Sequence, residues 1–218
     1  RSPSRGLGDV YKRQYQLHAA VLVNGTCTDR LAQQFGMRSF TQDTESPQCK
    51  GMFYLNGRSI RLRGANTMGF EQQDVLRGDL PQLIDDILLA KLCNMNFLRL
   101  TQRPVQDEVY EYCDKLGLMT QTDLPLFGVM RRFRVPEGIR QAEELARMVR
   151  KHPCNVVVSY INEPFPNANN EPHRHLLRPE LENFFTCCDL VVKLSNPDQV
   201  IKLSLIHISE PTRRTPIS

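Results

Sequence analysis

The 218-residue sequence contains no tryptophan, which disfavours a carbohydrate-binding module built on exposed indole rings. It has no apolar run near the roughly 18 residues that a membrane helix needs, so we expect no membrane partner. Its seven cysteines include no C-x-x-C pair, which leaves little support for a structural zinc site. With 40% hydrophobic and 24% charged residues, the composition is globular and excludes the collagen-like, low-complexity and disordered classes.

The formal net charge of +4 lies entirely in the two ends of the chain. Residues 1–14 carry four basic side chains and one acidic one, residues 203–218 carry two and one, and the residues between them are neutral in sum. Both ends lack a helical or strand period and resemble translated sequencing-adapter read-through, so we expect non-native flanks, with a natural disordered tail as the alternative. The middle of the chain offers no basic surface for nucleic acid, and localisation and oligomeric state stay open.

A metal cluster is also not expected. The residues His173 and His175 could be combined with the adjacent Cys187 and Cys188, but their spacing matches no standard site. Three cysteines fall on apolar helix faces, where a thiol is usually a small core side chain: Cys93, Cys113 and Cys188.

The N-terminal part reads as strands and turns. Residues 15–24 show partial strand alternation and stop at Asn24-Gly25, and residues 25–50 are polar and rich in turn residues. Residues 53–60 read as a hairpin turning at Asn56-Gly57, followed by a strand over 60–66.

From residue 60 onward, strands alternate with helices. Further strands are expected at 96–100, 118–123, 155–161 and 199–202. Between them lie helical patterns: an apolar stripe from Leu80 to Leu92 capped by Asp79, and stripes over 109–116, 142–149 and 181–192. Regular alternation predicts a parallel sheet, closed either as a doubly wound sheet or as a (β/α)8 barrel.

The barrel is favoured over the doubly wound sheet. No G-x-G-x-x-G follows the first strand, and polar residues stand at the carboxyl ends of successive strands, where barrel enzymes hold their chemistry. These residues are Asn66, Arg99 with Gln102, Asp123, and Asn162 with Glu163. A barrel needs about 250 residues. Residues 60–202 suffice for four β/α units and the start of a fifth.

The most informative stretch runs from Lys151-His152-Pro153-Cys154 through a buried strand to Asn162-Glu163-Pro164. A carboxylate directly after such a strand either caps the next segment or works in a cleft. This pattern resembles the acid/base motif of glycoside hydrolase family 2, which includes β-galactosidases, β-glucuronidases and β-mannosidases.

Other stretches resemble the same family in order and spacing. Residues 53–66 look like the approach to its first barrel strand, 96–104 like its second strand, 112–118 like the following helix and turn, and 123–128 like its third strand end. Phe35-Gly36-Met37-Arg38 resembles the end of the preceding β-sandwich domain. The resemblance implies the end of an immunoglobulin-like sandwich at 15–40 and the N-terminal half of a TIM-barrel catalytic domain at 41–202.

The family implies a retaining glycosidase acting on a carbohydrate without cofactor or metal. By resemblance, Glu163 is the general acid/base, Asn162 binds the sugar 2-hydroxyl and Arg99 lies near the nucleophile. The alternative for Arg99 is an ordinary ion pair at the barrel end. Asn66, Asp123 and Gln102 are further predicted substrate-binding residues. His173 and His175 either line a distal subsite or are surface histidines.

The chain departs from the family pattern at three places, which suggests an altered sugar pocket. Thr101-Gln102 replaces the usual Ser-His, Met68 stands where His is frequent, and Asp123 stands where Glu is commoner. The family's nucleophile lies on the seventh strand, beyond the expected fifth. We therefore expect a β-galactosidase-like hydrolase fragment that is inactive alone. The alternatives are a non-catalytic carbohydrate-binding barrel and an unrelated retaining barrel glycosidase.

Overall fold

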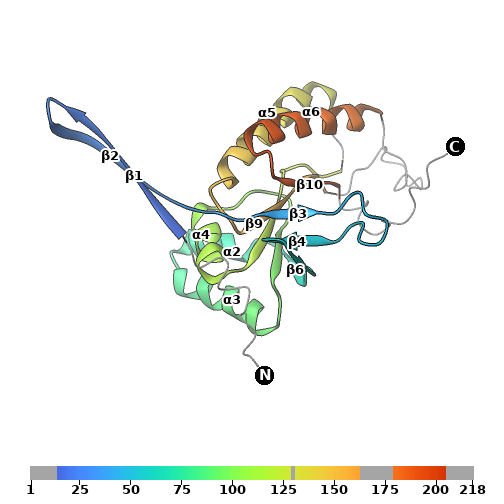
Figure 1. Cartoon of the computed structure of the whole chain (residues 1–218), viewed down its shortest axis with the longest axis horizontal. Helices are drawn as coiled ribbons and strands as arrows, with labels where there is room; N and C mark the ends of the chain where they lie inside the picture. The colour runs from blue at the N-terminus through green and yellow to red at the C-terminus, as the bar shows by residue number, and fades with distance from the viewer. Residues whose placement is uncertain (1–13, 129–130, 163–178, 205–218) are drawn as a thin grey trace.

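The computed structural model of the chain describes residues 14–128, 131–162 and 179–204. Its main sheet has five parallel strands, each paired with the next one in the chain (Figure 1). These strands are β6 (Gly64–Thr67), β7 (Phe97–Leu100), β8 (Met119–Asp123), β9 (Asn155–Ile161) and β10 (Val200–Ser204). An added Cβ at Gly64 would lie 1.8 Å from the carbonyl oxygen of Phe97, so only glycine permits the close pairing of β6 with β7.

Helices connect the strands, as the alternating pattern predicts. They are α2 (Phe70–Arg77), α3 (Leu80–Leu92), α4 (Asp107–Leu116), α5 (Val135–Val149) and α6 (Pro179–Ser195), with a 3-10 turn η1 at Arg132–Arg134. The predicted N-cap of α3 is confirmed, because the Asp79 carboxylate accepts a hydrogen bond from the Gln82 backbone N–H at 3.2 Å. Helix α2 is not predicted from the sequence, because its eight residues between two glycines make too short a stripe.

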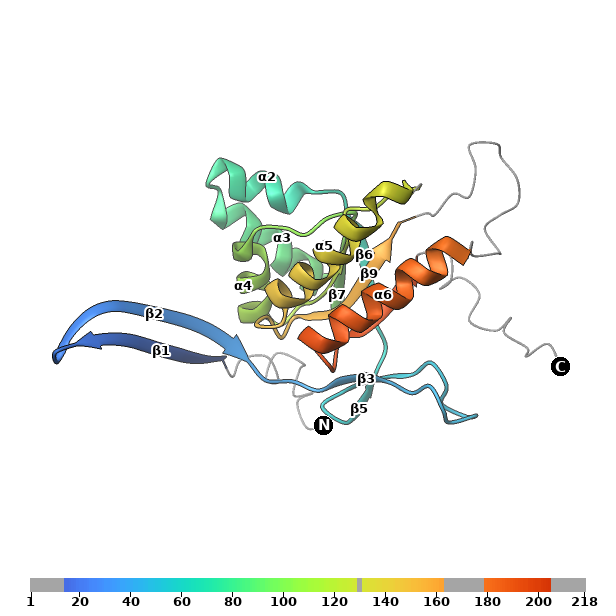
Figure 2. The same ribbon diagram turned by 90° about the horizontal axis from the view of Figure 1, so that it is seen from above.

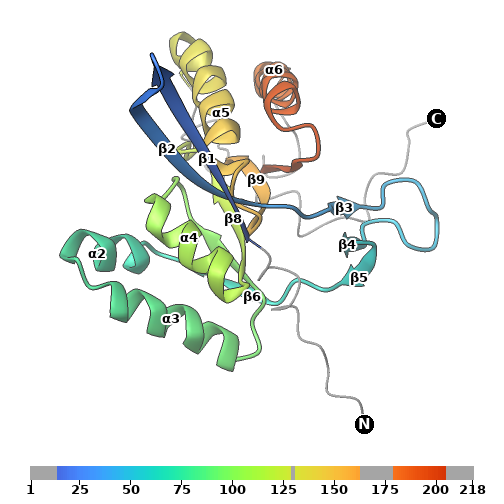
Figure 3. The ribbon, with the colours of Figure 1, turned by 60° about the vertical axis from the view of Figure 1, so that its left-hand side comes forward.

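The helices decide between the two closures that the sequence leaves open. Helical side chains from α3 to α6 pack with Leu98, Leu100, Val158 and Tyr160 on one face of the sheet. The other face carries a second apolar cluster made of strand and loop residues, including Met119 and Val157. A doubly wound sheet has helices on both faces, whereas a barrel has them on one. The described sheet is therefore barrel-like, and the predicted partial (β/α)8 fold is confirmed (Figure 3).

A small antiparallel sheet packs on the face of the main sheet that does not carry the helices, here called the inner face. It consists of β3 (Phe40–Gln42), β4 (Phe53–Leu55) and β5 (Arg58–Ile60). Phe40 and Leu55 are buried against Met119 and Val157. The predicted hairpin turn is confirmed, since Asn56 and Gly57 both have positive φ, at 50° and 75°. The predicted continuous strand over 60–66 is wrong, because the chain leaves the small sheet after Ile60 and joins the large one only at Gly64.

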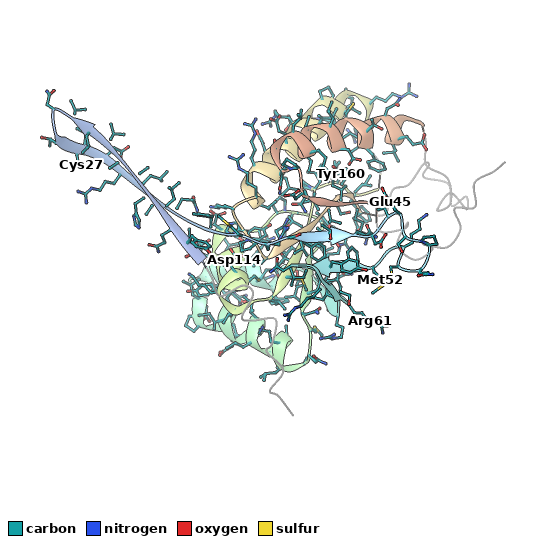
Figure 4. All side chains as sticks on the ribbon, in the orientation of Figure 1. Cys27, Glu45, Met52, Arg61, Asp114 and Tyr160 are labelled. Carbon is teal, nitrogen blue, oxygen red and sulfur yellow. The ribbon has the colours of Figure 1, made fainter. Side chains whose placement is uncertain are left out.

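The N-terminal hairpin extends away from the body of the molecule (Figure 2). It pairs β1 (Gln14–Val23) with β2 (Thr26–Gly36), and Cys27 lies near its tip (Figure 4). The polar stretch 25–50 thus contains an 11-residue strand as well as turns, because the Asn24-Gly25 turn folds it back onto β1.

The motif Phe35-Gly36-Met37-Arg38 attaches this hairpin to the barrel. The Arg38 guanidinium donates to the backbone oxygens of Pro153, at 2.9 Å, and Asn155, at 2.5 Å. An added Cβ at Gly36 would lie 2.5 Å from Pro153 Cγ, so the backbone at Gly36 packs closely against the Pro153 ring. Residues separated by more than a hundred positions are joined in this way. The domain boundary predicted at residue 40 stays a prediction.

Three side chains of the predicted apolar helix faces are exposed. Leu88 and Leu92 are 38% and 84% exposed, because α3 turns only Leu83 and Ile87 fully toward the sheet. Cys93 is exposed because it follows the last helical residue, whereas Cys113 and Cys188 are buried as predicted. No helix in the described part of the chain has the length and apolar character to cross a bilayer. The predicted flanks lie almost wholly outside the described residues.

Candidate active site

The inner face of the sheet changes character along the strands. Register places Arg99 beside Gln121, and places Asp123, Ser159 and Lys202 in one row across β8, β9 and β10. Two residues earlier on the same strands, Phe97, Met119, Val157 and Val200 belong to the inner apolar cluster. Alternate residues of a strand share a face. The carboxyl-terminal part of the inner face is therefore an inner polar layer made of Arg99, Gln121, Asp123, Ser159 and Lys202.

A buried ion pair lies at the centre of this layer. Arg99 is 4% exposed and Asp123 is fully buried. The guanidinium Nε donates to Asp123 Oδ1 at 3.2 Å, and Nη2 donates to Asp123 Oδ2. Two parallel hydrogen bonds fix the plane of the guanidinium and hold its positive charge against the carboxylate. The alternative expected for Arg99, an ion pair at the barrel end, is thus present in the structure.

Asp123 is fully occupied by protein donors. Besides the two bonds from Arg99, Oδ1 accepts from Gln121 Nε2 at 2.9 Å and Oδ2 accepts from the Gln102 backbone N–H at 3.1 Å. A carboxylate has about four acceptor sites, and all are used here. Asp123 therefore orients Arg99 and anchors the loop after β7. Gln102 contributes through its backbone, held at a positive φ of 67°.

Asn162 joins the same network from the end of β9. Its Oδ1 accepts from Arg99 Nη2 at 2.9 Å. Its backbone is held by the loop after β8, since its N–H donates to Leu126 O at 2.9 Å and its carbonyl accepts from the Gly128 N–H at 3.0 Å. With Oδ1 committed to Arg99, the amide orientation is set and Nδ2 is the group that can donate to a ligand.

Sequence reasoning missed Ser159 and Lys202. Ser159 is fully buried, and its Oγ has no hydrogen-bond partner. Lys202 is half-buried, and burial together with the nearby Arg99 charge lowers the pKa of its ammonium to about 8, while Asp123 acts in the opposite direction. Alternation along 199–202 could have placed Lys202 on the inner face, but only pairing with β9 puts it beside Ser159.

Not every predicted site residue joins this network. Asn66 lies opposite Arg99 in register but is exposed on the edge strand β6, and its side chain takes no part in the network seen among the described residues. Glu163, His173 and His175 lie outside the described residues. Across 14–128, 131–162 and 179–204, no three His, Cys, Asp or Glu side chains gather as a metal site requires.

The fold and sequence are similar to those of known glycosidases. The family described as "Glycosyl hydrolases family 2, TIM barrel domain" matches residues 49–179, more than half of the chain. The chain is 29% identical over 158 residues to β-glucuronidase of Mus musculus, covering 69% of this chain and 23% of that protein.

Two solved structures show the same fold. A β-glucuronidase from Bacteroides uniformis has a TM-score of 0.69 at 23% identity, covering 88% of this chain and 23% of that one. A family 2 member from Bacteroides cellulosilyticus DSM 14838 has a TM-score of 0.67 at 19% identity, covering 92% and 26%. The chain thus spans about a quarter of these relatives' length. The alternative of an unrelated barrel family is wrong, and the chain belongs to glycoside hydrolase family 2, of whose TIM barrel domain it carries a part.

Proposed function

We propose that this chain supplies the acid/base half of the active site of a retaining β-glycosidase, with a carbohydrate as substrate. The observation that supports it is the buried network of Arg99, Asp123 and Asn162 at the carboxyl ends of three adjacent strands of a family 2 barrel domain. Glu163 follows Asn162 directly in the sequence, so the network fixes the residue that precedes the proposed acid.

In the proposed mechanism, Glu163 acts twice. It first gives its proton to the glycosidic oxygen while the bond to the anomeric carbon breaks and a second carboxylate, about 5–5.5 Å away, bonds to that carbon. Its carboxylate then takes a proton from water, whose oxygen displaces the second carboxylate. Asn162 Nδ2 donates to the sugar 2-hydroxyl, and the Arg99 charge favours the ionised form of the nucleophile.

We further propose that the 218-residue chain hydrolyses no glycoside alone. The described sheet has five parallel strands, whereas a closed barrel has eight, and the family's nucleophile belongs to the seventh. The chain should release no 4-nitrophenol from 4-nitrophenyl β-glucuronide, the type of substrate that the names of two relatives suggest. It should also release none from 4-nitrophenyl β-galactoside, the type of substrate expected from the sequence. Turnover by the chain that Glu163→Gln abolishes would contradict this expectation.

The catalytic proposal is tested in a longer polypeptide of the same gene that carries the complete barrel. Glu163→Gln should lower kcat/KM for a 4-nitrophenyl glycoside by about 10²–10⁴-fold. The loss should be much smaller for a 2,4-dinitrophenyl glycoside, because that leaving group departs without a proton. Added azide should restore turnover and yield the glycosyl azide, since azide attacks the intermediate without base assistance. Glu182, which is exposed on α6, provides the control variant Glu182→Gln, with unchanged kcat. Equal losses on both substrates would reject Glu163 as the acid.

A non-catalytic carbohydrate-binding barrel is the second candidate. Two replacements favour it. Met68, which is 79% exposed, stands where the family frequently has histidine, and Thr101-Gln102 stands where it usually has Ser-His. Sugar binding by the longer polypeptide without turnover of either aryl glycoside would support this candidate.

A further inference from the structure

We propose that Arg38 and Gln199 are positioning residues for the proposed active site, because they hold a β-bulge at Val156 that sets where Asn162 and Glu163 begin. This inference rests on the proposed function and deepens it by naming two residues that act on the site through strand β9. Neither residue has a role in the site that the sequence predicts.

The register between β8 and β9 shifts by one residue near the start of β9. Thr120 is paired with Asn155. The next residue, Gln121, is paired with Val157 instead of Val156. Val156 therefore has no partner in β8, which is the pattern of a β-bulge. Without the extra residue, every later position of β9 would be displaced along β8 by one residue, or about 3.3 Å.

The bulge also changes which side chains of β9 face the inside. The Asn155 side chain lies on the helix-covered face, where its Oδ1 accepts from Thr122 beneath α4. Strict alternation from Asn155 would place Val157 on that face as well. Val157 instead belongs to the inner apolar cluster together with its neighbour Val156, and Val158 packs against the helices. A slip of one residue moves the side chains of a strand to the opposite face, so the bulge decides the inward set.

Two side chains from distant parts of the chain supply donors to the bulge. The Arg38 guanidinium, from the linker before β3, donates to the Pro153 oxygen at 2.9 Å and to the Asn155 oxygen at 2.5 Å. The Gln199 amide, just before β10, donates to the Val156 oxygen at 3.2 Å. Asn155, Val156 and Gln199 are at most 1% exposed. A carbonyl oxygen left unpaired there would be costly, so these donors stabilise the bulged register.

Strand β9 carries the position of the bulge to the candidate site. All seven residues of β9 are buried, and Asn162 directly follows the last of them. Asn162 Oδ1 accepts from Arg99 Nη2 at 2.9 Å, a hydrogen bond that a displacement of about 3.3 Å would break. Arg38 binds at the amino end of β9, roughly 20 Å from Asn162 at the rise of a strand. Arg38 therefore acts on Asn162 through β9 and not by contact.

The inference is tested first in the 218-residue chain by NMR, with the Asn162 side-chain amide signals as the readout. Arg38→Met and Gln199→Met each remove donors from the bulge and should shift or split these signals, because β9 then populates a second register. Arg63 gives the matched control. Its guanidinium donates to the Asn94 backbone oxygen at 3.0 Å, before β7, and Arg63→Met should leave the Asn162 signals unchanged.

The second test uses the longer polypeptide that carries the complete barrel. Arg38→Met should lower kcat/KM for a 4-nitrophenyl glycoside by about tenfold or more, because misplacement by about 1 Å is enough for such a loss. The loss should be smaller for a 2,4-dinitrophenyl glycoside, which leaves without the proton that Glu163 supplies. A variant that is merely destabilised would lose activity equally on both substrates. Arg38→Lys, which keeps a donor, should recover part of the loss, and Arg63→Met should show none.

Unchanged Asn162 signals in Arg38→Met and Gln199→Met would overturn the inference. Equal losses on the two substrates would do the same where Glu163→Gln shows unequal ones. If Arg38→Met does not fold, Gln199→Met decides by the same measurements. The proposed function is decided separately: it fails if Glu163→Gln loses activity equally on both substrates, whereas the Asn162 signals still report on the bulge. The expected effect of Glu163→Gln, together with unchanged kinetics of Arg38→Met, would refute this inference alone.

Discussion

Two buried clusters of polar side chains lie on opposite faces of β8 and β9. One is the inner polar layer. The other, the outer polar cluster, lies between α4 and the start of β9 and consists of Tyr110, Asp114, Thr122, His152 and Asn155. Asp114 accepts from the Cys154 N–H at 2.8 Å and lies 2.8 Å from His152 Nδ1. Thr122 donates to Asn155 Oδ1 at 2.7 Å, and its Oγ1 lies 2.9 Å from the Tyr110 hydroxyl oxygen. Asp114 is labelled in Figure 4.

The two clusters differ in charge and in position on the sheet, while all of their side chains except the half-buried Lys202 are buried. The outer cluster also contains atoms without a hydrogen-bond partner among the described residues, His152 Nε2 and Asn155 Nδ2. However, it pairs one carboxylate with one imidazole beneath a helix, whereas the inner layer sets two cations against one carboxylate at the strand ends. Burial and unpaired atoms therefore do not identify a ligand site by themselves. The position at the carboxyl ends of parallel strands, where barrel enzymes hold their chemistry, is the more specific sign.

The largest effect is expected from breaking the inner ion pair. Asp123→Ala leaves the Arg99 guanidinium buried without its partner and removes the acceptor for Gln102 and Gln121. Its free energy of unfolding, measured with urea, should fall by about 3–5 kcal/mol. The double variant Arg99→Met with Asp123→Leu should recover most of this loss, because neither partner of the ion pair is then left without the other. A double variant as unstable as the single one would show that the pair is not the cause.

A smaller loss is expected in the outer polar cluster. Asp114→Ala removes one acceptor from the backbone of Cys154 and one partner from His152, and should cost about 2–3 kcal/mol. Asp114→Asn keeps one oxygen acceptor and should cost less. Both variants, at temperatures where they are folded, should keep the Asn162 side-chain amide signals of the unchanged chain, since Asp114 is an acceptor and donates to no carbonyl of the bulge. Shifted signals would show that the outer polar cluster also positions the end of β9.

The smallest change is a gain in stability. Burial and the Arg99 charge hold the pKa of Lys202 at about 8, below the usual 10.5, so the unfolded chain binds more protons between these values and stability rises with pH there. The burial cost is therefore fully present below pH 8. At pH 7, the free energy of unfolding of Lys202→Met should exceed that of the unchanged chain by about 1 kcal/mol, a value reduced for solvent screening. The difference should shrink toward pH 10, while Lys50→Met, at an exposed position, should show none. A destabilised Lys202→Met would indicate that the ammonium has a partner.

Several elements follow directly from local sequence. The run from Asn155 to Ile161 is apolar and β-branched at its centre, and it forms β9 with the predicted bounds. Gly117 ends α4 in the left-handed conformation, as a glycine after a helical stripe predicts. Helix α2 and strand β2 follow less directly, because a short helix and a polar strand depend on partners distant in the chain.

By itself, the sequence determined the alternation of strands and helices, the polar strand ends and the likeness to family 2, because these depend on residue types at neighbouring positions. Only the tertiary structure decided that the described helices lie on one face of the sheet, that Asp123 accepts hydrogen bonds from Arg99, Gln121 and Gln102, and that Lys202 is paired with Ser159. These features depend on the register between strands and on which donors lie within hydrogen-bond distance of each acceptor. The spacing of residues along one chain contains neither.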